Sequence, residues 1–422
     1  MQPKRYPFSS WMTLSDWDVD LAERVQEWAD IGFTLIMSPE VTAEPATHEK
    51  ARKLLDLCAA REIEVILIDQ RTEAPSGNWG TPDKKIDLPD DYRQRAAKAV
   101  AEFADHPALW GFYVTDEPLV GNLPAVAKAC RILRELTDKA EPYVNYLPHH
   151  LLSPDGTSAG IERHVGFKDF GAYLDHVVGT TGATMLCYDQ YCSMSPEWGG
   201  PEQWYRCLSD YQHAAIRHDI PFWNIILAHG HWMYRAPSAL EMSWQFYNSL
   251  AYGAQGIMYF MYRTGGIGRY GAPVDELGNR GPLFCQLQRQ HAQFLRQWAW
   301  RYRQCRPVAT YHWPKAPAGL KSLDATGVVA GIVEDPSTLH RPTEASHLVV
   351  GEFLDDEDRP HVMVANGSWS KHTFARVTVR GRGVLSIAGE GKEKRLDRRE
   401  DGQASFATHF MPGQAEFVRV EV

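Results

Sequence analysis

Long apolar runs are absent from this sequence of 422 residues, and its cysteines are few. No run approaches the roughly 18 apolar residues that a membrane-spanning helix needs. The first residues carry no apolar stretch with a small-residue cleavage site, so no secretory signal peptide is predicted. The seven cysteines contain no Cys-x-x-Cys pair, which argues against a disulfide framework and a structural zinc site. We therefore expect reduced thiols, a cytoplasmic location and no membrane partner.

Basic residues are fewer than acidic ones. Lysine and arginine total 44 against 53 aspartates and glutamates, so the net charge is −9 and the field of the whole chain repels nucleic acid. The loop glycines 199–200 and 265–268 lack both the GxGxxG spacing and a phosphate-binding lysine, and no GxSxG motif occurs. These absences predict no nucleotide cofactor, no nucleic-acid partner and no serine-hydrolase elbow.

Aromatic residues, in contrast, are plentiful. The chain holds 14 Trp, 18 Tyr and 16 Phe within an ordinary globular composition of 44% hydrophobic and 23% charged residues. Tryptophan is large and seldom fully buried, so a core alone does not account for all of these side chains. Their positions along the chain therefore bear on function.

Eight short apolar runs alternate with amphipathic segments over the first 305 residues. The amphipathic segments include residues 20–31, 48–61, 91–104 and 123–140. Most runs are apolar at consecutive positions, which is typical of strands buried on both faces of a parallel sheet. The runs are 8–12, 33–37, 64–68, 109–115, 143–147, 184–188, 222–228 and 256–262. Eight strand–helix repeats in this length predict an α/β fold, a (β/α)8 TIM barrel over residues 1–305.

The rest of the chain shows short strand candidates and no helical pattern. Short strand candidates at 327–333, 347–353, 361–365, 374–379, 404–410 and 415–422 are separated by turns rich in Asp and Gly. We therefore expect a C-terminal all-β sandwich domain over residues 306–422. The acidic stretch 354–359 is interpreted as a solvated loop.

Polar and titratable residues follow the predicted strands at one end, where the active sites of such barrels form. They are Asp69, Asp116, Glu117, His149, Asp189, Tyr191, His229, His231 and Arg263. Three tryptophans, Trp79, Trp198 and Trp232, fall in predicted loops at the same end. The aromatic excess is therefore expected to gather around this end of the barrel.

The most informative segment ends in Asp116-Glu117-Pro118. The apolar strand 109–115 delivers an acidic pair to the barrel mouth, and the proline stops the strand there. A partly buried carboxylic acid near aromatic walls has a raised pKa, which suits a general acid. The alternative is structural: the two acids would cap the next helix or pair with a lysine.

At this point a resemblance becomes visible. The segment 106–118 resembles the fourth-strand region of the retaining-glycosidase superfamily of (β/α)8 barrels, in which the usual ending is Asn-Glu-Pro and the Glu is the acid/base. The segment 243–263 is similar to the seventh helix and eighth strand of family 42 β-galactosidases. The late stretch 411–418 is similar to the accessory β-domain of such enzymes. The resemblance implies a glycosidase that needs no cofactor and acts on a carbohydrate substrate. It also allows a homo-oligomer, because related enzymes often associate.

The departures from that pattern concern the second carboxylate. Asp116 stands where the superfamily has the Asn that contacts the sugar 2-hydroxyl, and segment 223–231, at the end of strand seven, lacks the usual nucleophilic Glu. Glu241 follows, but its position is typical of a helix cap. Asp189 is therefore the favoured base or nucleophile, with Asp69 as the next choice. The alternative for Asp189 is to bind a substrate hydroxyl or to hold a loop.

Histidine and arginine allow more than one interpretation. Four histidines, His149, His150, His229 and His231, could compose a divalent-metal site together with the acids, but their spacing favours hydrogen bonds to sugar hydroxyls, and no metal is predicted. Arg263 could bind a substrate carboxylate or form an ion pair with Asp116 or Asp189.

Taken together, these residues predict a hydrolase that cleaves an O-glycosidic bond in a glycoside or oligosaccharide. Glu117 is the expected general acid and Asp189 the expected second catalytic carboxylate. The expected substrate-binding residues are Asp116, Asp69, His149, Tyr191, His229, His231, Trp79, Trp198, Trp232 and Arg263. The alternatives are a metal-dependent barrel acting as a sugar isomerase or lyase, which a chelator would inactivate, and a noncatalytic glycan-binding barrel.

Overall fold

The structure is a computed structural model of the whole chain. It describes residues 1–13, 17–74, 86–149, 162, 165–192, 201–265, 268–324, 326–334, 346–400 and 403–422. Trp79, His150 and Trp198 lie outside the described residues. Among the described residues, no helix is both long enough and apolar enough to cross a bilayer.

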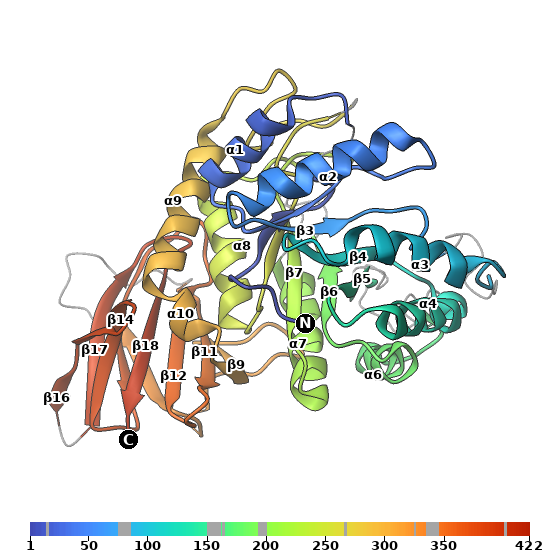
Figure 1. The fold of residues 1–422 in the computed structure, drawn as a ribbon. Coiled ribbons are helices and arrows are strands. Elements are labelled where there is room, and N and C mark those ends of the chain that lie inside the picture. Colours follow the sequence, from blue (N-terminus) through green and yellow to red (C-terminus); the bar gives the residue numbers. More distant parts are fainter. Residues whose placement is uncertain are drawn as a thin grey trace. The chain divides into compact units, whose positions relative to one another are not determined.

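The N-terminal part is a (β/α)8 barrel, as predicted, with a strand in each of the eight apolar runs (Figure 1). All eight strands are largely buried on both faces, which explains why the sequence shows runs rather than alternation. The strands are β1 (Phe8–Ser10), β2 (Leu35–Met37), β3 (Glu64–Leu67), β4 (Leu109–Asp116), β5 (Glu141–Asn145), β6 (Leu186–Asp189), β7 (Phe222–Leu227) and β8 (Ile257–Phe260).

Parallel pairing joins these strands into two four-stranded sheets, β2-β3-β4-β5 and β1-β8-β7-β6. Two seams close the ring. At one seam the Thr34 amide donates to the Phe8 carbonyl over 3.1 Å, and at the other the Tyr146 amide donates to the Cys187 carbonyl over 2.7 Å. The second seam brings the end of β5 beside the end of β6, which matters for the site described below.

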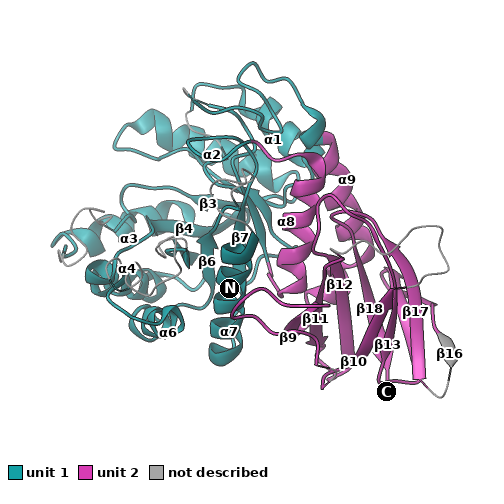
Figure 2. Cartoon of the chain, turned by 180° about the vertical axis from the view of Figure 1, so that it is seen from behind, with its two compact units in different colours: residues 1–235, 256–284 teal, residues 236–255, 285–422 magenta. Residues whose placement is uncertain are grey.

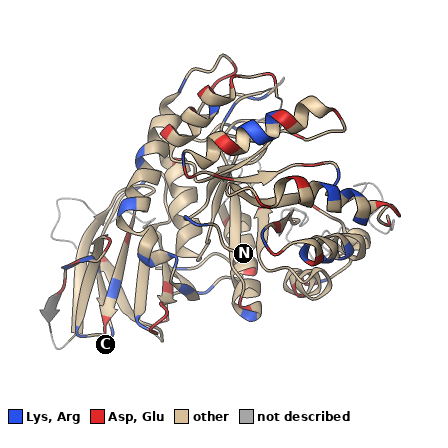
Figure 3. Ribbon diagram, in the orientation of Figure 1, with Lys and Arg blue, Asp and Glu red and all other residues tan. Residues whose placement is uncertain are grey.

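Amphipathic helices follow the strands along the chain, with acidic and basic residues interspersed on them (Figure 3). In the first, Asp20 caps the N-terminus by accepting from the amides of Ala22 and Glu23, and Gly32 ends it at a φ of 87°. The helices are α1 (Leu21–Ile31), α2 (Pro45–Ala59), α3 (Tyr92–Phe103), α4 (Leu123–Leu136), α6 (Phe170–Thr181), α7 (Pro201–His218), α8 (Ala239–Ala251), α9 (Pro282–Gln297) and α10 (Ala299–Tyr302).

Large aromatic side chains fill the barrel interior. Trp110 lies 5.1 Å from Trp223, ring centre to ring centre, and Tyr143 lies within 6.5 Å of both and of Trp11. All four are buried, together with Leu35, Ile66 and Met258. Part of the tryptophan excess therefore serves packing in the barrel, and its inner layers form a solid core rather than a pore.

By compactness, the chain divides into two units (Figure 2). Unit 1 comprises Met1–Arg235 and Gly256–Phe284, and unit 2 comprises Ala236–Gln255 and Cys285–Val422. Helix α8 and most of α9 therefore group with the C-terminal strands. The domain boundary expected after residue 305 stays a prediction, because these units are defined by compactness alone.

Within unit 2, antiparallel strands form two sheets with the orders β10-β13-β17-β16 and β15-β14-β18-β12-β11-β9. The six expected strands are present, and four were missed. The strands are β9 (Arg306–Trp313), β10 (Val329–Glu334), β11 (Leu348–Leu354), β12 (Pro360–Asn366), β13 (Thr373–Val379), β14 (Gly383–Gly389), β15 (Lys392–Arg395), β16 (Arg398–Glu400), β17 (Gln403–Phe410) and β18 (Ala415–Glu421). Val350, Val364, Val377 and Val418 belong to the core that both sheets share, so this is the predicted sandwich.

The acidic turn after β11 is not simply solvated, which corrects the interpretation of residues 354–359. Asp355 is only 1% exposed, and its carboxylate accepts from the Glu357 and Arg359 amides. The Arg359 and Arg301 guanidinium groups also donate to it, over 2.9 and 3.2 Å. Four donors hold the charge in place, so Asp355 fixes the turn and joins α10 to the sheet.

Replacing Asp355 with alanine should therefore destabilise the sandwich strongly. The change leaves a nearly buried Arg301 without its acceptor, and breaking such a pair costs about 3–5 kcal/mol. Urea unfolding followed by circular dichroism measures this loss. Asp356→Ala, at an exposed position in the same turn, is the control and should cost less than about 1 kcal/mol. Equal losses in the two variants would contradict this role for Asp355.

Candidate active site

The ends of three neighbouring strands place two acids and an amide side by side. The parallel register of β4 and β5 pairs Asp116 with Asn145. On the other side, Tyr146 pairs with Tyr188, so Asn145 also lies beside Asp189 at the end of β6. Because the strands are parallel, all three side chains emerge at the C-terminal end of the barrel.

Hydrogen bonds join these groups to Glu117. The Asn145 Nδ2 donates to Asp116 Oδ1 over 2.9 Å and to Asp189 Oδ1 over 2.8 Å. The Glu117 amide donates to the Asn145 carbonyl over 2.8 Å, and Asp189 is near enough to raise the pKa of the Glu117 carboxyl. Asp116, Glu117, Asp189 and Asn145 are called the acid cluster below. The structure thus brings together the two expected catalytic residues.

Glu117 adopts an unusual backbone conformation. Its φ is 41°, a left-handed value that is uncommon for a residue with a long side chain. Such strain persists only where the surroundings hold it, and it concentrates at functional positions. The alternative that Asp116 and Glu117 cap the next helix is wrong, because α4 has Asn122 at its N-cap and no side-chain cap.

Crowding of negative groups raises two pKa values in the cluster. Burial, then the charges of Asp189 and Asp116, and then the hydrogen bond to Asp189 raise the pKa of Glu117 well above its ordinary value. Burial and the Asp189 charge raise the pKa of Asp116 to about 7. Within the described residues, no lysine or arginine pairs with these acids. The surroundings of Glu117 therefore favour its protonated form.

The raised pKa of Asp116 predicts a pH-dependent stability cost. Ionisation of Asp116 is disfavoured in the folded protein. The folded state therefore bears no cost from this group below about pH 4, and the cost of ionising it grows as the pH rises and is complete above about pH 7. Asp116→Asn should remove this cost and raise the unfolding free energy by on the order of 2 kcal/mol at about pH 8, with little change near pH 4. Chemical unfolding at both pH values measures this difference. A gain that is equal at both would contradict it.

An aromatic wall lies beside Asp189. Burial, and then the nearby Asp189 charge, raise the pKa of Tyr191 well above its ordinary value. The Tyr191 ring stacks on Phe260 with ring centres 5.0 Å apart and packs edge-on against His231 and Tyr234, with ring centres 5.6 Å apart in both pairs. Burial, then the nearby Asp189 charge, raise the pKa of Tyr234 to about 12. Flat apolar faces next to acids suit the faces of a sugar ring.

The two histidines after β7 are neutral groups in this wall. Their rings stack with centres 4.7 Å apart, and burial lowers the pKa of both, that of His229 to about 4. The Met261 amide donates to His229 Nδ1 over 2.7 Å, which puts the proton of the neutral ring on Nε2. Among the described residues, His229 Nε2 and both His231 nitrogens are buried without hydrogen-bond partners. These nitrogens are suited to bind hydroxyl groups of a ligand.

One loop tryptophan lies beside this wall. Trp232 is 88% exposed at the tip of a tight turn in which His231 and Tyr234 exchange backbone hydrogen bonds. Its ring centre is 5.3 Å from that of His231. Trp232 and the tyrosines lie beside this wall, but most of the described tryptophans are buried, among them Trp28, Trp110, Trp204, Trp223 and Trp244, so the expected gathering of the tryptophan excess stays a prediction. Trp79 and Trp198 fall outside the described residues.

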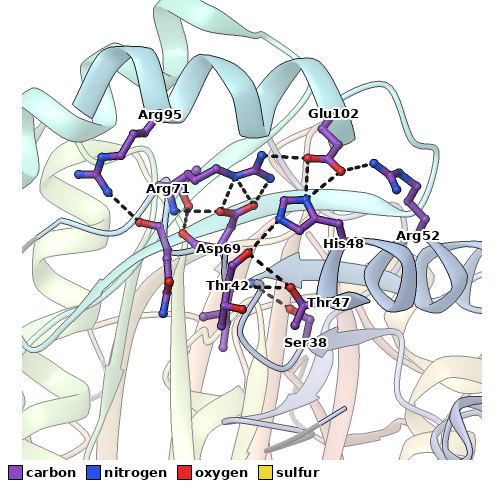
Figure 4. Close-up of polar contacts among 12 residues, drawn as sticks. Ser38, Thr42, Thr47, His48, Arg52, Asp69, Arg71, Arg95 and Glu102 are labelled. Carbon is purple, nitrogen blue, oxygen red and sulfur yellow. Dashed lines mark hydrogen bonds and ion pairs between the residues drawn. The ribbon is translucent and has the colours of Figure 1, made fainter. Parts of the chain in front are cut away.

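Asp69 is held in a separate ionic network (Figure 4). It is fully buried, and the Arg71 guanidinium donates to both of its carboxylate oxygens, over 2.9 Å to Oδ1 and 2.7 Å to Oδ2. Arg71 also pairs with Glu102, which in turn contacts His48 and Arg52. With both oxygens engaged, Asp69 has less capacity to bind a hydroxyl, and the substrate-binding role stays a prediction.

Two other expected binding residues have protein partners of their own. His149 stacks on Phe170 with ring centres 4.5 Å apart, and its Nδ1 lies 2.5 Å from the Asp210 carboxylate. Arg263 pairs with Glu27 of α1 at 3.6 Å, rather than with Asp116 or Asp189. The structure does not bring these two into the acid cluster through any contact among the described residues, and their roles stay predictions.

Sequence reasoning missed Asn145 and Glu73. Asn145 directly ends β5, and it was overlooked because the strand was extended to residue 147. Glu73 follows β3, where burial and the charges of Glu40 and Asp69 raise its pKa to about 7. A single acid in a loop carries no distinguishing signal in the sequence.

Glu241 has the capping role that was expected. The Glu241 amide donates to the Ser238 hydroxyl, and the Ser238 amide donates to the Glu241 carboxylate over 2.7 Å. Among the described residues, no group of three His, Cys, Asp or Glu side chains is arranged to hold a metal ion. All seven cysteines are described and are free thiols.

Solved structures of other proteins have a fold similar to that of this chain. No family model matches the chain, and no curated protein sequence matches it. A glycoside hydrolase family 5 protein from Bacteroides vulgatus has a similar structure, with a TM-score of 0.60 and 9% identity over 99% of this chain and 89% of that one. A family 39 glycoside hydrolase from Bacteroides cellulosilyticus gives 0.52 and 12%, covering 99% and 81%.

A β-galactosidase from the psychrophilic Marinomonas ef1 is a third similar structure. Its TM-score is 0.49 at 10% identity, and the likeness covers 68% of this chain. The chain spans 59% of the length of that enzyme. From the two fuller matches, the chain has the fold of glycoside hydrolases built from a (β/α)8 barrel and a β domain.

Proposed function

We propose that this protein is a glycoside hydrolase in which Glu117 is the general acid and Asp189 the second catalytic carboxylate. The observation that carries the proposal is the acid cluster: Glu117, whose pKa is raised by burial and by its acidic neighbours, lies beside Asp189, a carboxylate that accepts from the Asn145 amide. Glycoside hydrolysis needs a proton donor and an ionised carboxylate together. The fold shared with glycoside hydrolases supports the same class of reaction.

The closeness of the two carboxyl groups supports a retaining mechanism. Asp189 is near enough to Glu117 for its charge to raise the pKa of that carboxyl, and a close pair favours retention, because retaining enzymes hold their acids about 5–5.5 Å apart and inverting enzymes roughly 6.5–9.5 Å apart. In the first step Asp189 attacks the anomeric carbon as the bond to the leaving oxygen breaks, and that oxygen takes the proton of Glu117. In the second step Glu117 removes a proton from water, which attacks the anomeric carbon and releases Asp189.

The substrate is proposed to be a carbohydrate bound through ring stacking and hydroxyl contacts. The aromatic wall of Tyr191, Tyr234 and Phe260 offers flat faces, and His229 and His231 are neutral partners for hydroxyl oxygens. The positive charge that develops at the anomeric carbon in the transition state would be stabilised by the surrounding acids.

A panel of aryl glycosides and oligosaccharides tests the proposal. We expect the protein to hydrolyse at least one of them. NMR should show that the first sugar product has the same anomeric configuration as the substrate. An inverted first product would make Asp189 a general base instead of a nucleophile. Binding of saccharides without turnover of any panel member would make the protein a noncatalytic glycan-binding barrel and would overturn the proposal.

A further inference from the structure

Asn145 touches all three acids of the cluster. Its side-chain amide donates to Asp116 and Asp189, and its carbonyl oxygen accepts from the Glu117 amide. The residue is 2% exposed, so water does not replace these bonds readily. Among the residues that the structure describes, no other one hydrogen-bonds to all three acids, which makes Asn145 the structural link between them.

The chemistry of an amide gives this link a direction. Both hydrogens of Nδ2 are used, one on each carboxylate, and an N–H donor stabilises an ionised acceptor over a protonated one. Two acceptor oxygens on the same nitrogen also assign the orientation of the amide. Glu117 receives no side-chain donor from Asn145, so the amide favours ionisation of its two neighbours and not of Glu117.

We propose that Asn145 is a positioning residue that holds Asp189 as the ionised acceptor of the acid cluster and so favours the proton on Glu117. The catalytic role of Asn145 rests on the proposed function, because a retaining glycosidase needs a protonated general acid and an ionised nucleophile at the same time. The hydrogen bond from Asn145 also lowers the pKa of Asp116 against the larger effects of burial and the Asp189 charge, which supports the assignment.

The tyrosines and thiols that face the cluster do not change charge in the working range. They are Tyr113 and Tyr143 from the strands, Tyr173 from α6, Tyr191 and Tyr234 from the loops, and the thiols Cys187 and Cys207. Burial raises the pKa of every one of these groups, to about 12 for Tyr234, and burial lowers the pKa of His231. Glu73, which faces Tyr113, is the nearest further acid, and its pKa is about 7.

The first test is the pH profile of kcat/KM. Asn145→Ala should move the acidic limb to higher pH by about one to two units, because each hydrogen bond to a charged group is lost from an ionised state that catalysis needs. Asn145→Asp, which keeps the shape of the side chain but removes its amide donor, should move the same limb in the same direction. A profile that is lowered uniformly, with both limbs in place, would show that Asn145 has only a structural role and would overturn the proposal.

Asn248→Ala is the matched control. Asn248 is also fully buried, and its Nδ2 donates to two carbonyl oxygens, of Trp244 over 2.8 Å and of Asn366 over 3.2 Å. This variant should lose stability comparably but keep both limbs of the pH profile where they are in the wild type. A shift of the acidic limb in this control would count against a specific role for Asn145.

A second readout needs no turnover. Infrared absorption of protonated carboxyl groups at about pH 8 should lose a band on Glu117→Gln in the wild-type background, and should retain part of it in the Asn145→Ala background. Loss of the whole band in both backgrounds would overturn the proton placement. If the infrared result holds while no glycoside is hydrolysed, the placement stands and the proposed function fails.

Discussion

Glu117→Gln should reduce kcat/KM by about 10²–10⁴-fold on glycosides whose leaving group needs a proton. Glutamine has nearly the same shape as glutamate, so it fits the strained position at the end of β4, but it supplies no acidic proton. The reduction corresponds to about 3–5 kcal/mol of lost transition-state stabilisation. Steady-state kinetics on an alkyl glycoside or a disaccharide measure it.

Glu241→Gln is the matched control for that variant. The same chemical change is made at another nearly buried glutamate, 3% exposed, which caps α8 through its side chain. Glutamine serves as well in a capping box, so this variant should fold normally and keep its activity. If Glu117→Gln retained wild-type activity, or if both variants lost it equally, Glu117 would not be the general acid.

Asp189→Asn should reduce turnover by on the order of 10³-fold or more, because the anomeric carbon then has no nucleophile. Asparagine keeps an oxygen that accepts from Asn145, so the cluster retains its shape. An external anion such as azide should restore part of the turnover by attacking from the vacated side. The product should be a glycosyl azide with the configuration opposite to that of the wild-type sugar product.

Asp169→Asn is the corresponding control. Asp169 caps α6 by accepting from the Ala172 amide over 2.7 Å, and asparagine caps helices about as well. Full activity in this variant would show that the Asp-to-Asn change is harmless outside the cluster. If Asp189→Asn were as active as this control, the second carboxylate would have to be another acid, with Glu73 the first to examine.

Local pattern was enough to predict the barrel. Strands buried on both faces appear as apolar runs, and the apolar strand 109–116 delivers Asp116 and Glu117 to the mouth as expected. Asp189, from a strand that follows 70 residues later, was placed near Glu117 solely by counting strands around the ring. That step works because parallel strands all point their carboxyl ends one way.

Partners distant in sequence could not be predicted in the same way. Arg263 was expected at Asp116 or Asp189, but it pairs with Glu27 of α1, and no local pattern indicates such a choice. Asp355 is in an acidic, loop-like stretch, yet arginines from two segments make its burial possible. Asn145 was missed because a shift of two residues at the end of a strand decides which side chain reaches the site.

The dependence on the leaving group tests the central claim most directly. We would compare kcat/KM of the wild type and Glu117→Gln on a dinitrophenyl glycoside, whose leaving group needs no proton, and on the alkyl glycoside of the same sugar. A general acid predicts near-equal rates on the first substrate and a loss of about 10²–10⁴-fold on the second. An equal loss on both substrates, or no loss on either, would contradict the assignment of Glu117 as the residue that protonates the leaving oxygen.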